Sequence, residues 1–487
     1  MKHIAAAAAA AAIALSALVP LHPSGATPLT TESADGRHEH GHEHGGGATI
    51  GLTRAVALAQ DNDPDLQYLR SLHAADRYRV ADRYRAAFPR LSLSYAHSDT
   101  VAYASPDNRS RRASIGVEQL LYDGGRTRRA IRIARTDRDL RGLAAEKRER
   151  EIAHTVTRSY LQVLALRQRV EISESTLEIS RAHLEIGRRR HALEQTTSLS
   201  LRELELNLQS QKLDLLELQL EHVAASRRFA RLIDPSHERR YPEGRLNIEY
   251  SGVPYEMLRS IRPADGVIRS RAYAEQRAYL RQAVQREQVA RRSFLPRVSL
   301  EGELSATGNE FPLDRPGFSI GVRVQLAPVL GSASVAGSVG SPYPDARTRT
   351  VESSMVPLER LTNLYSVADA RNERLRAEAS YTRHRDTEIS VLSLAIEEIG
   401  RRREHIALLR RRIATQRERI AISELRAELG ELTRLDLLEQ IEQLNALESR
   451  LAEGVVDLHE RELSLLERTG FEYEPALSSE IIAGGGR

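Results

Sequence analysis

The sequence predicts a mainly helical fold with a smaller β part. Charged residues make up 28% of the 487 residues and aromatic residues only 5%, and tryptophan is absent. A compact core in a chain of this length would use more large aromatic side chains. Abundant Arg, Glu, Leu and Ala, with apolar residues recurring every seven positions, instead favour long antiparallel helices that pack along narrow coiled-coil seams.

The chain contains two copies of one structural plan. FPRLSL at Phe88–Leu93 returns as LPRVSL at Leu295–Leu300, 207 positions later. Two heptad rows match at an offset of 236; they are Val156, Val163, Val170, Leu177 and Leu184, and Leu392, Ile399, Ile406, Ile413 and Ile420. The larger second offset places an insertion of about thirty residues in copy two. The Gly/Ser/Pro-rich segment Gly331–Thr350 is the candidate for it.

These signals divide the chain into six parts. A basic residue, an apolar run and small residues predict a signal peptide at the N-terminus. No other segment reaches the ~18 apolar residues of a membrane-spanning helix, so none is expected in the mature chain. The predicted parts are the signal peptide 1–26, a flexible His/Gly-rich segment 27–50, the first repeat 51–236, a linker 237–262, the second repeat 263–470 with the insertion near 331–362, and a tail 471–487.

Each repeat predicts one long helix between two shorter ones. At 1.5 Å per residue a long helix of this length spans about 100 Å. The two short helices together match the length of the long one, which predicts that they stack end to end along it. The expected long helices are Arg126–His191 and Asn363–Leu429, and the short ones are Leu52–Ala87, 200–232, Pro263–Phe294 and 434–468.

Two strand-like runs in each repeat, four in all, alternate apolar and polar residues. This pattern over about ten residues is typical of a transmembrane β-barrel strand, although a soluble half-buried sheet gives the same alternation. The residues predicted to face lipid are Leu91, Leu93, Tyr95, Ile115, Val117, Val298, Leu300, Phe318, Ile320, Val322 and Val324.

The composition and motifs exclude several kinds of chemistry. Absent cysteine rules out disulfides, thiolate sites and a lipid-acceptor cysteine. The sequence has no nucleophile elbow, P-loop or dinucleotide fingerprint, so neither an enzyme nor a cofactor is predicted. Arginines and glutamates alternate along the helices, which indicates solvated faces and no nucleic-acid groove despite the net charge of +4.

A histidine-rich tract near the N-terminus contains a literal H-E-x-x-H at His38–His42. The neighbouring glycines disfavour the helix that a zinc protease needs. Short His-rich tracts bind metal loosely, so weak metal binding is the alternative expectation there. Its candidate ligands are His38, His40, His42 and His44.

A turn interrupts the helical pattern at ELGELTRLDLLEQ, Glu428–Gln440. A glycine can end the long helix, a threonine can cap the returning helix, and an aspartate suits the first turn. These residues are Gly430, Thr433 and Asp436, and the matching positions in copy one are Glu194, Thr197 and Ser200. We therefore expect two helical-hairpin tips that are not equivalent.

The sequence resembles the TolC-like outer-membrane efflux protein family in LTRAVALAQDNDPDLQ, FPRLSLSY, VEQLLYDGGRTRRA and GELTRLDLLE. The resemblance implies a homotrimer in which each protomer gives four transmembrane strands to a twelve-stranded barrel, while the helices form a periplasmic α-barrel. It also implies that the tips, at Gly430, Thr433, Asp436, Thr197 and Ser200, dock on a periplasmic adaptor. That adaptor would couple them to an inner-membrane efflux pump or ABC exporter.

These expectations point to a passive exit duct in the outer membrane of a Gram-negative-type bacterium, serving tripartite efflux or secretion. The alternatives are a periplasmic coiled-coil scaffold or adaptor without a barrel, and a metal-handling component that acts through the histidine tract. Copy two lacks a match to Asp123–Gly125 and carries the insertion instead, which leaves open how its second strand joins the long helix. Drugs, metals and polypeptides all remain candidate substrates.

Overall fold

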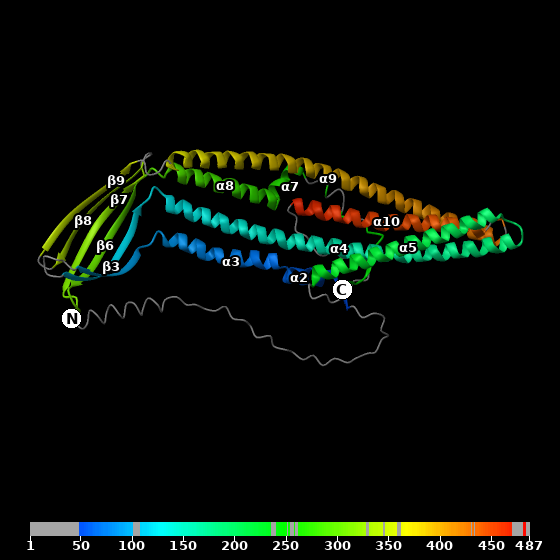
Figure 1. Ribbon diagram of the computed structural model, residues 1–487. Coiled ribbons are helices and arrows are strands. Elements are labelled where there is room, and N and C mark those ends of the chain that lie inside the picture. Colours follow the sequence, from blue (N-terminus) through cyan, green and yellow to red (C-terminus); the bar gives the residue numbers. More distant parts are fainter. Residues whose placement is uncertain are drawn as a thin grey trace. The chain divides into compact units, whose positions relative to one another are not determined.

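The computed structural model describes residues 48–100, 108–234, 240–250, 252–253, 258, 262–327, 331–343, 346–357, 362–429, 431–432, 434–469 and 481–483. The predicted signal peptide, the tract His38–His44, and the tip residues Gly430 and Thr433 lie outside these residues. Within the unit Gly47–Arg487, a layer of paired helices is joined to a six-stranded antiparallel sheet (Figure 1).

Two helices of 67 residues organise the layer: α4 (Arg126–Ala192) and α9 (Thr362–Glu428). Both agree with the predicted long helices to within one residue at each end. The heptad rows are the buried seam, since Val156 is 1% and Ile399 0% exposed, and only Val170 is half-buried. The predicted coiled-coil packing of the long helices is therefore confirmed.

The shorter helices stack end to end along the long ones, as predicted (Figure 1). On α4, the amide of Asn62 at the end of α2 donates to the carbonyl oxygen of Ile233 at the end of α5, at 2.8 Å. On α9, the corresponding helices α7 and α10 are also in contact. These helices are α2 (Leu52–Asn62), α3 (Pro64–Arg85), α5 (Ser198–Ile233), α7 (Pro263–Arg269), α8 (Arg271–Arg291) and α10 (Arg434–Thr469).

The prediction that the first helix of each repeat is continuous was wrong. Pro64 cannot donate a backbone hydrogen bond to the preceding turn, and the Asp63 carboxylate caps the new helix by accepting from the Leu66 amide at 2.7 Å. Ser270 makes the same kind of break between α7 and α8, where its hydroxyl accepts from the Tyr273 amide at 3.1 Å. Ser270 follows Asp63 by 207 positions, so the break belongs to the repeat.

Asp63 also ties the break to the long helix. Its carboxylate accepts a hydrogen bond from the Arg148 guanidinium of α4 at 2.7 Å. Burial alone would raise the pKa of Asp63, but the bonds from Arg148 and the Leu66 amide hold it below its ordinary value. The junction of α2 and α3 is therefore held by an ionised carboxylate at neutral pH.

The expected count of four strands in the sheet was also wrong. The strand order is β2 (Arg90–Thr100), β3 (Asn108–Tyr122), β6 (Arg297–Gly308), β7 (Arg315–Leu326), β8 (Gly331–Tyr343) and β9 (Ala346–Pro357). The insertion is the hairpin β8–β9, so the second copy reaches its long helix through two further strands. Its glycine and serine content disfavours strands by local propensity, but pairing with β7 from Phe318 to Leu326 outweighs that preference.

Two small sheets hold the inter-repeat linker against the helices. β1 (Ala48–Ile50) pairs in parallel with β4 (Arg240–Pro242), and β5 (Arg245–Leu246) pairs antiparallel with β10 (Ile482–Ala483). No helix in the described part of the chain combines the length and the apolar composition that crossing a membrane requires.

A buried polar cluster fastens the same linker to α9 and α10. Glu462 is 1% exposed; its carboxylate accepts from the Tyr250 hydroxyl at 2.8 Å and from the Arg403 guanidinium, which also donates to the carbonyl of Val253. Burial raises the pKa of Glu462, although the bonds from Arg403 and Tyr250 oppose the rise. His459 lies 3.0 Å from the Tyr250 hydroxyl, and burial lowers its pKa to about 4, so its ring is neutral at pH 7.

This cluster predicts a large stability effect at Arg403. We expect Arg403→Met to lower the free energy of unfolding by about 3–5 kcal/mol, because it leaves the Glu462 carboxylate buried without its ion-pair partner. Adding Glu462→Gln should recover part of the loss. Thermal unfolding of the purified protein measures both changes. Arg401→Met is the control, since the Arg401 side chain is 83% exposed and its removal should cost under about 0.5 kcal/mol. Equal unfolding midpoints for the two single variants would contradict the cluster's role.

Candidate functional site: the sheet surface and the helical tips

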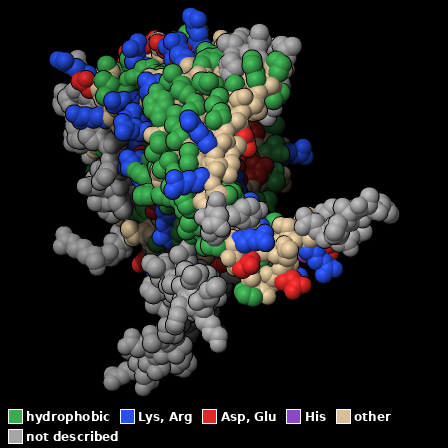
Figure 2. All heavy atoms as spheres, turned by 90° about the vertical axis from the view of Figure 1, so that its left-hand side faces the viewer, with side chains coloured by type: hydrophobic (Ala, Val, Ile, Leu, Met, Phe, Trp, Pro, Cys, Tyr) green, Lys and Arg blue, Asp and Glu red, His purple; other side chains and the backbone are tan. Residues whose placement is uncertain are grey.

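Strand pairing brings the predicted apolar residues together on one face of the sheet. Leu93 pairs with Ile115, Ile115 with Leu304, and Leu304 with Phe318. Directly paired residues share a face, so the alternation along each strand aligns across the sheet. Leu93 is 77% and Ile320 59% exposed, and Figure 2 shows hydrophobic side chains gathered at this end of the molecule. The same face carries Leu91, Tyr95, Val117, Leu300 and Val322, with Val298 and Val324 half-buried.

The hairpin β8–β9 extends this apolar face, which the sequence pattern did not predict. Val335 pairs with Val324 and Val339 pairs with Ile320, and Val351 and Met355 are exposed on the same face of β9. The alternation of Ala333, Val335, Gly337 and Val339 was a strand signal in the sequence. It is weak because small residues occupy half of the apolar positions.

The opposite face of the sheet is polar and charged. It carries a hollow of about 360 Å³ whose lining includes Glu118, Glu301, Glu303, Arg323 and Glu352. The Arg323 guanidinium donates to the Glu301 carboxylate at 2.9 Å, and Arg112 donates to Glu303 at 2.8 Å. All of these side chains are partly exposed, so the pairs add little stability. These charged side chains make this face of the sheet hydrophilic, while the other face is apolar.

A tight turn fixes where the first repeat passes from sheet to helix. The Asp123 carboxylate accepts from the backbone amides of Gly125 at 2.8 Å and Thr127 at 2.6 Å. Burial alone would raise the pKa of Asp123, but these bonds lower it. Gly124 has φ of +69°, and a Cβ there would lie 2.7 Å from Leu295 Cδ1. Only glycine fits both the backbone and the close contact with the second repeat.

The two tips end their long helices with the same hydrogen bond. In the first, the Gln195 amide donates to the Arg190 carbonyl at 2.9 Å, and in the second the Glu431 amide donates to the Arg426 carbonyl at 2.9 Å. Both partners are displaced by 236 positions, which confirms the repeat offset at the tips. The bond is that of a Schellman helix end, whose C′ residue takes the left-handed conformation.

Glu194 occupies that position in the first tip with φ of +55°. It is the sole non-glycine residue with positive φ in the described part of the chain. The Thr197 hydroxyl caps α5 by accepting from the Ser200 amide at 3.2 Å, and Asp436 lies exposed in the first turn of α10. The first-copy residues therefore form the predicted turn, and docking at either tip stays a prediction.

The strained Glu194 gives a testable difference between the tips. We expect Glu194→Gly to stabilise the turn by about 1 kcal/mol, because a side chain in the left-handed region costs about 1–2 kcal/mol and glycine avoids that cost. Hydrogen exchange of the amides around the turn should then slow about fivefold. Gln195→Gly is the control and should speed exchange instead. Faster exchange in the Glu194 variant would contradict the assignment.

The outer helices of the layer expose apolar rows. On α5, Leu199, Leu206, Leu213 and Leu220 recur every seven residues and are 62–70% exposed; on α9, Leu394, Leu408 and Ile422 recur every fourteen. Near the tips the contacts run from α5 to α4, α4 to α10 and α10 to α9, so the two rows lie at opposite edges of the layer. The heptad spacing on α5 is visible in the sequence, which predicted the short helices only as partners that cover the long ones.

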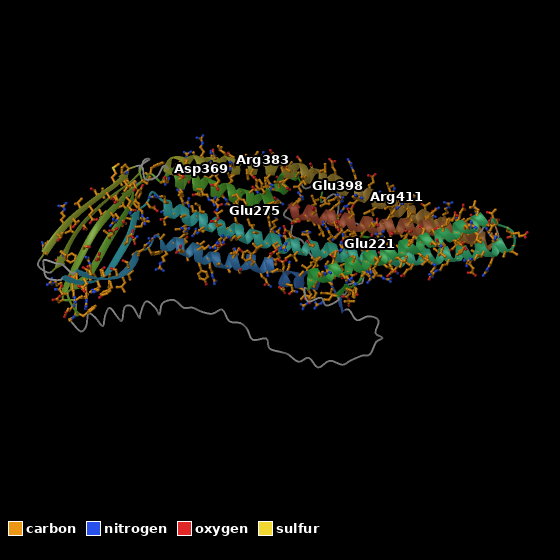
Figure 3. The ribbon with its side chains drawn as sticks, in the orientation of Figure 1. Glu221, Glu275, Asp369, Arg383, Glu398 and Arg411 are labelled. Atoms are coloured by element: carbon orange, nitrogen blue, oxygen red, sulfur yellow. The ribbon has the colours of Figure 1, made fainter. Side chains whose placement is uncertain are left out.

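Charged side chains of both signs lie along the helices. Figure 3 labels Glu221, Glu275, Asp369, Arg383, Glu398 and Arg411, which come from α5, α8 and α9. Acidic and basic residues alternate within α9, so this helix offers no continuous basic stripe to nucleic acid. In the residues that the structure describes, no group of His, Asp and Glu side chains is placed to hold a metal ion.

Comparisons with known proteins agree with this architecture. Residues 55–233 match the family described as outer membrane efflux protein. The fold is similar to the CmeC outer membrane channel of Campylobacter jejuni, with 14% identity, 88% of each chain covered and a TM-score of 0.65. It is also similar to the MtrE outer membrane channel of Neisseria gonorrhoeae, with 14% identity, 86% of this chain and 89% of that chain covered and a TM-score of 0.65.

A third solved structure with the same fold is the outer membrane protein VceC of Vibrio cholerae, with 15% identity, 86% of this chain and 97% of that chain covered and a TM-score of 0.63. No curated protein matches the sequence significantly. The resemblance predicted from the sequence is thus confirmed: the first repeat matches the outer membrane efflux protein family, and the fold is similar to that of solved outer-membrane channels.

Proposed function

We propose that this chain is the outer-membrane exit duct of a tripartite efflux or secretion system. The observation that carries the proposal is the six-stranded sheet, which is apolar and exposed on one face and charged on the other. Such a sheet suits a barrel wall with lipid outside and water inside. A sheet in lipid must also close on itself, because an open edge would leave backbone groups without partners.

Closure of the barrel requires further copies of the chain, and the helical layer offers the matching surface. The leucine row of α5 and the apolar row of α9 lie at opposite edges of the layer, so α5 of one copy can pack against α9 of the next. Three copies, as the family resemblance implies, would enclose a tunnel with the helices as its periplasmic wall. Substrate would pass through passively, since no residue is assigned a chemical role.

The proposed partners are a periplasmic adaptor at the tips and an inner-membrane pump behind it. The two tips differ at the helix end, where the first carries Glu194 in a left-handed conformation and the second carries Gly430 in the sequence. We infer that the second tip, with Thr433 and the exposed Asp436, is the first place to look for adaptor contacts, while Thr197 and Ser200 mark the weaker candidate.

A periplasmic scaffold without a barrel would account for the helices but not for the apolar face of the sheet. The placement of Leu91, Leu93, Tyr95, Ile115 and Ile320 on one exposed face supports lipid contact. Cell fractionation separates the two functions, because a scaffold would remain in the soluble periplasmic fraction.

The lipid-facing role predicts a loss of membrane assembly when charge is placed on the outer face of β7. We expect the combined variant Ile320→Arg, Val322→Arg and Val324→Arg to disappear from the outer-membrane fraction, because each arginine at mid-membrane costs about 2–4 kcal/mol. Immunoblotting of fractionated cells without boiling reports the assembled oligomer. Gln325→Arg, on the charged face of the same strand, is the control and should insert normally. Normal insertion of the triple variant would refute lipid contact.

The helical contact between copies predicts a separate effect. We expect Leu206→Glu with Leu213→Glu to weaken the oligomer, since two charges would be buried in the proposed seam between α5 and α9. Analytical ultracentrifugation of detergent-extracted protein measures the change as a shift from trimer to monomer. Glu178→Lys is the control, because Glu178 is exposed on α4 and α4 lies between α5 and α10 within the layer. Equal sedimentation of both variants would remove α5 from the interface.

A further inference from the structure

The hairpin β8–β9 belongs to the wall of the sheet. Its first strand pairs with β7 over a continuous register, from Phe318 opposite Ser341 to Leu326 opposite Ala333. Its second strand then pairs with β8 from Gly331 opposite Pro357 onward. The hairpin therefore covers the edge of β7 that would otherwise be the end of the sheet.

The hairpin also continues both chemical faces of the wall. On the apolar face, Val335 and Val339 continue the rows of β7, and Val351 continues them onto β9. On the charged face, Thr350 and Glu352 join Arg323 around the hollow. A loop that merely crossed a barrel mouth would not be expected to keep this alternation over two strands.

Glycines explain why a sequence this rich in small residues forms strands here. A Cβ at Gly340 would lie 2.3 Å from the carbonyl oxygen of Phe318, and one at Gly321 would lie 2.9 Å from that of Gly337. The backbones of β7 and β8 thus approach at positions where one strand carries glycine opposite a serine of the other, Gly340 opposite Ser319 and Gly321 opposite Ser338. The composition that resembles a linker is needed for this close pairing.

The two terminal strands of the described sheet are β2 and β9, which have 11 and 12 residues. Every neighbouring pair is antiparallel and the strand number is six, so β9 runs opposite to β2. The free edge of β9 can consequently pair with the free edge of β2 in another copy without breaking the antiparallel order. Their lengths allow pairing along the full strand.

We propose that β9 of one copy pairs with β2 of the next, so that three copies close an eighteen-stranded barrel with the hairpin in its wall. The inference rests on the proposed function and changes the twelve strands that the family resemblance implies. Barrel diameter grows roughly in proportion to strand number, so this barrel would be about half as wide again as one of twelve strands. The competing arrangement keeps twelve strands by pairing β7 with β2 of the next copy and excluding the hairpin.

Disulfide cross-linking separates the two arrangements, and the chain has no cysteine of its own. Cysteines on neighbouring strands fall within the 4.4–6.8 Å Cα separation that a disulfide requires. If β9 pairs with β2 of the next copy, β7 lies three strand spacings, about 14 Å, from that β2, which is too far for a disulfide. One set of variants combines Ser92→Cys or Ser94→Cys with Thr348→Cys, Thr350→Cys or Ser354→Cys. The other set combines the same β2 positions with Ser319→Cys or Gln325→Cys. All of these positions lie on the charged face.

Cells are fractionated, the outer membranes are oxidised, and the products are separated without reductant. We expect a covalent dimer and trimer ladder from at least one β2–β9 combination and only monomer from every β2–β7 combination. Ser94→Cys with Ser114→Cys is the oxidation control, because the two hydroxyl oxygens are 2.7 Å apart within one protomer. It should form an internal disulfide without a ladder.

The contrary outcomes separate the inference from the proposed function. A ladder from β2–β7 with none from β2–β9 overturns the eighteen-stranded barrel and leaves the exit duct standing. Membrane-inserted protein that gives no ladder in either set also overturns it, because the sheet edges are then not neighbours. Parent protein that fractionates with the soluble periplasm overturns the exit duct itself.

Discussion

The burial of one seam along a very long helix is the constraint on which the structure depends. A helix of 67 residues extends about 100 Å, and its apolar row is covered only if partners run beside it for that whole distance. Each repeat meets this requirement with three short helices placed end to end: α2, α3 and α5 on α4, or α7, α8 and α10 on α9. Their meeting point then needs its own fastening, which Asn62 supplies at Ile233 and the Tyr250–Glu462 cluster supplies at the linker.

Much of this follows from the sequence because the governing signals are periodic. The seven-residue rows from Val156 and Leu392 predicted the seams, and the repeat offset of 236 aligned the two tips. The breaks at Asp63 and Ser270 were missed, although Pro64 was visible, because the apolar period continues across both. A cap decides such a break, and a cap is set by a single side chain that periodicity does not register.

The sheet was less predictable from the sequence than the helices. Strands β2, β3, β6 and β7 were predictable from their alternating apolar residues, whereas β8 and β9 were not. In β8 the small residues Ala333 and Gly337 share the apolar face with Val335 and Val339, and β9 begins Ala–Arg–Thr–Arg–Thr. Their strand character comes from pairing with β7, which is a tertiary effect. The charged-face cluster around Arg323 was likewise out of reach, since its members come from four strands.

The two open surfaces of the protomer point to one neighbour. At one edge of the protomer, strand β9 leads directly into α9, which carries one of the exposed apolar rows. At the other edge, β2 follows α3, and α3 stacks with α2 and α5 along α4. Helix α5 carries the other exposed apolar row. A copy that pairs its β2 with β9 therefore brings its α5 row to the side of the α9 row. Backbone hydrogen bonds between the sheets and apolar packing between the helices then form between the same two copies. If the hairpin lay outside the barrel wall, the sheet contact and the helix contact would no longer be joined by β9, because β9 would not connect the edge of the sheet to α9. The insertion in the second repeat thus joins the two seams into a single interface.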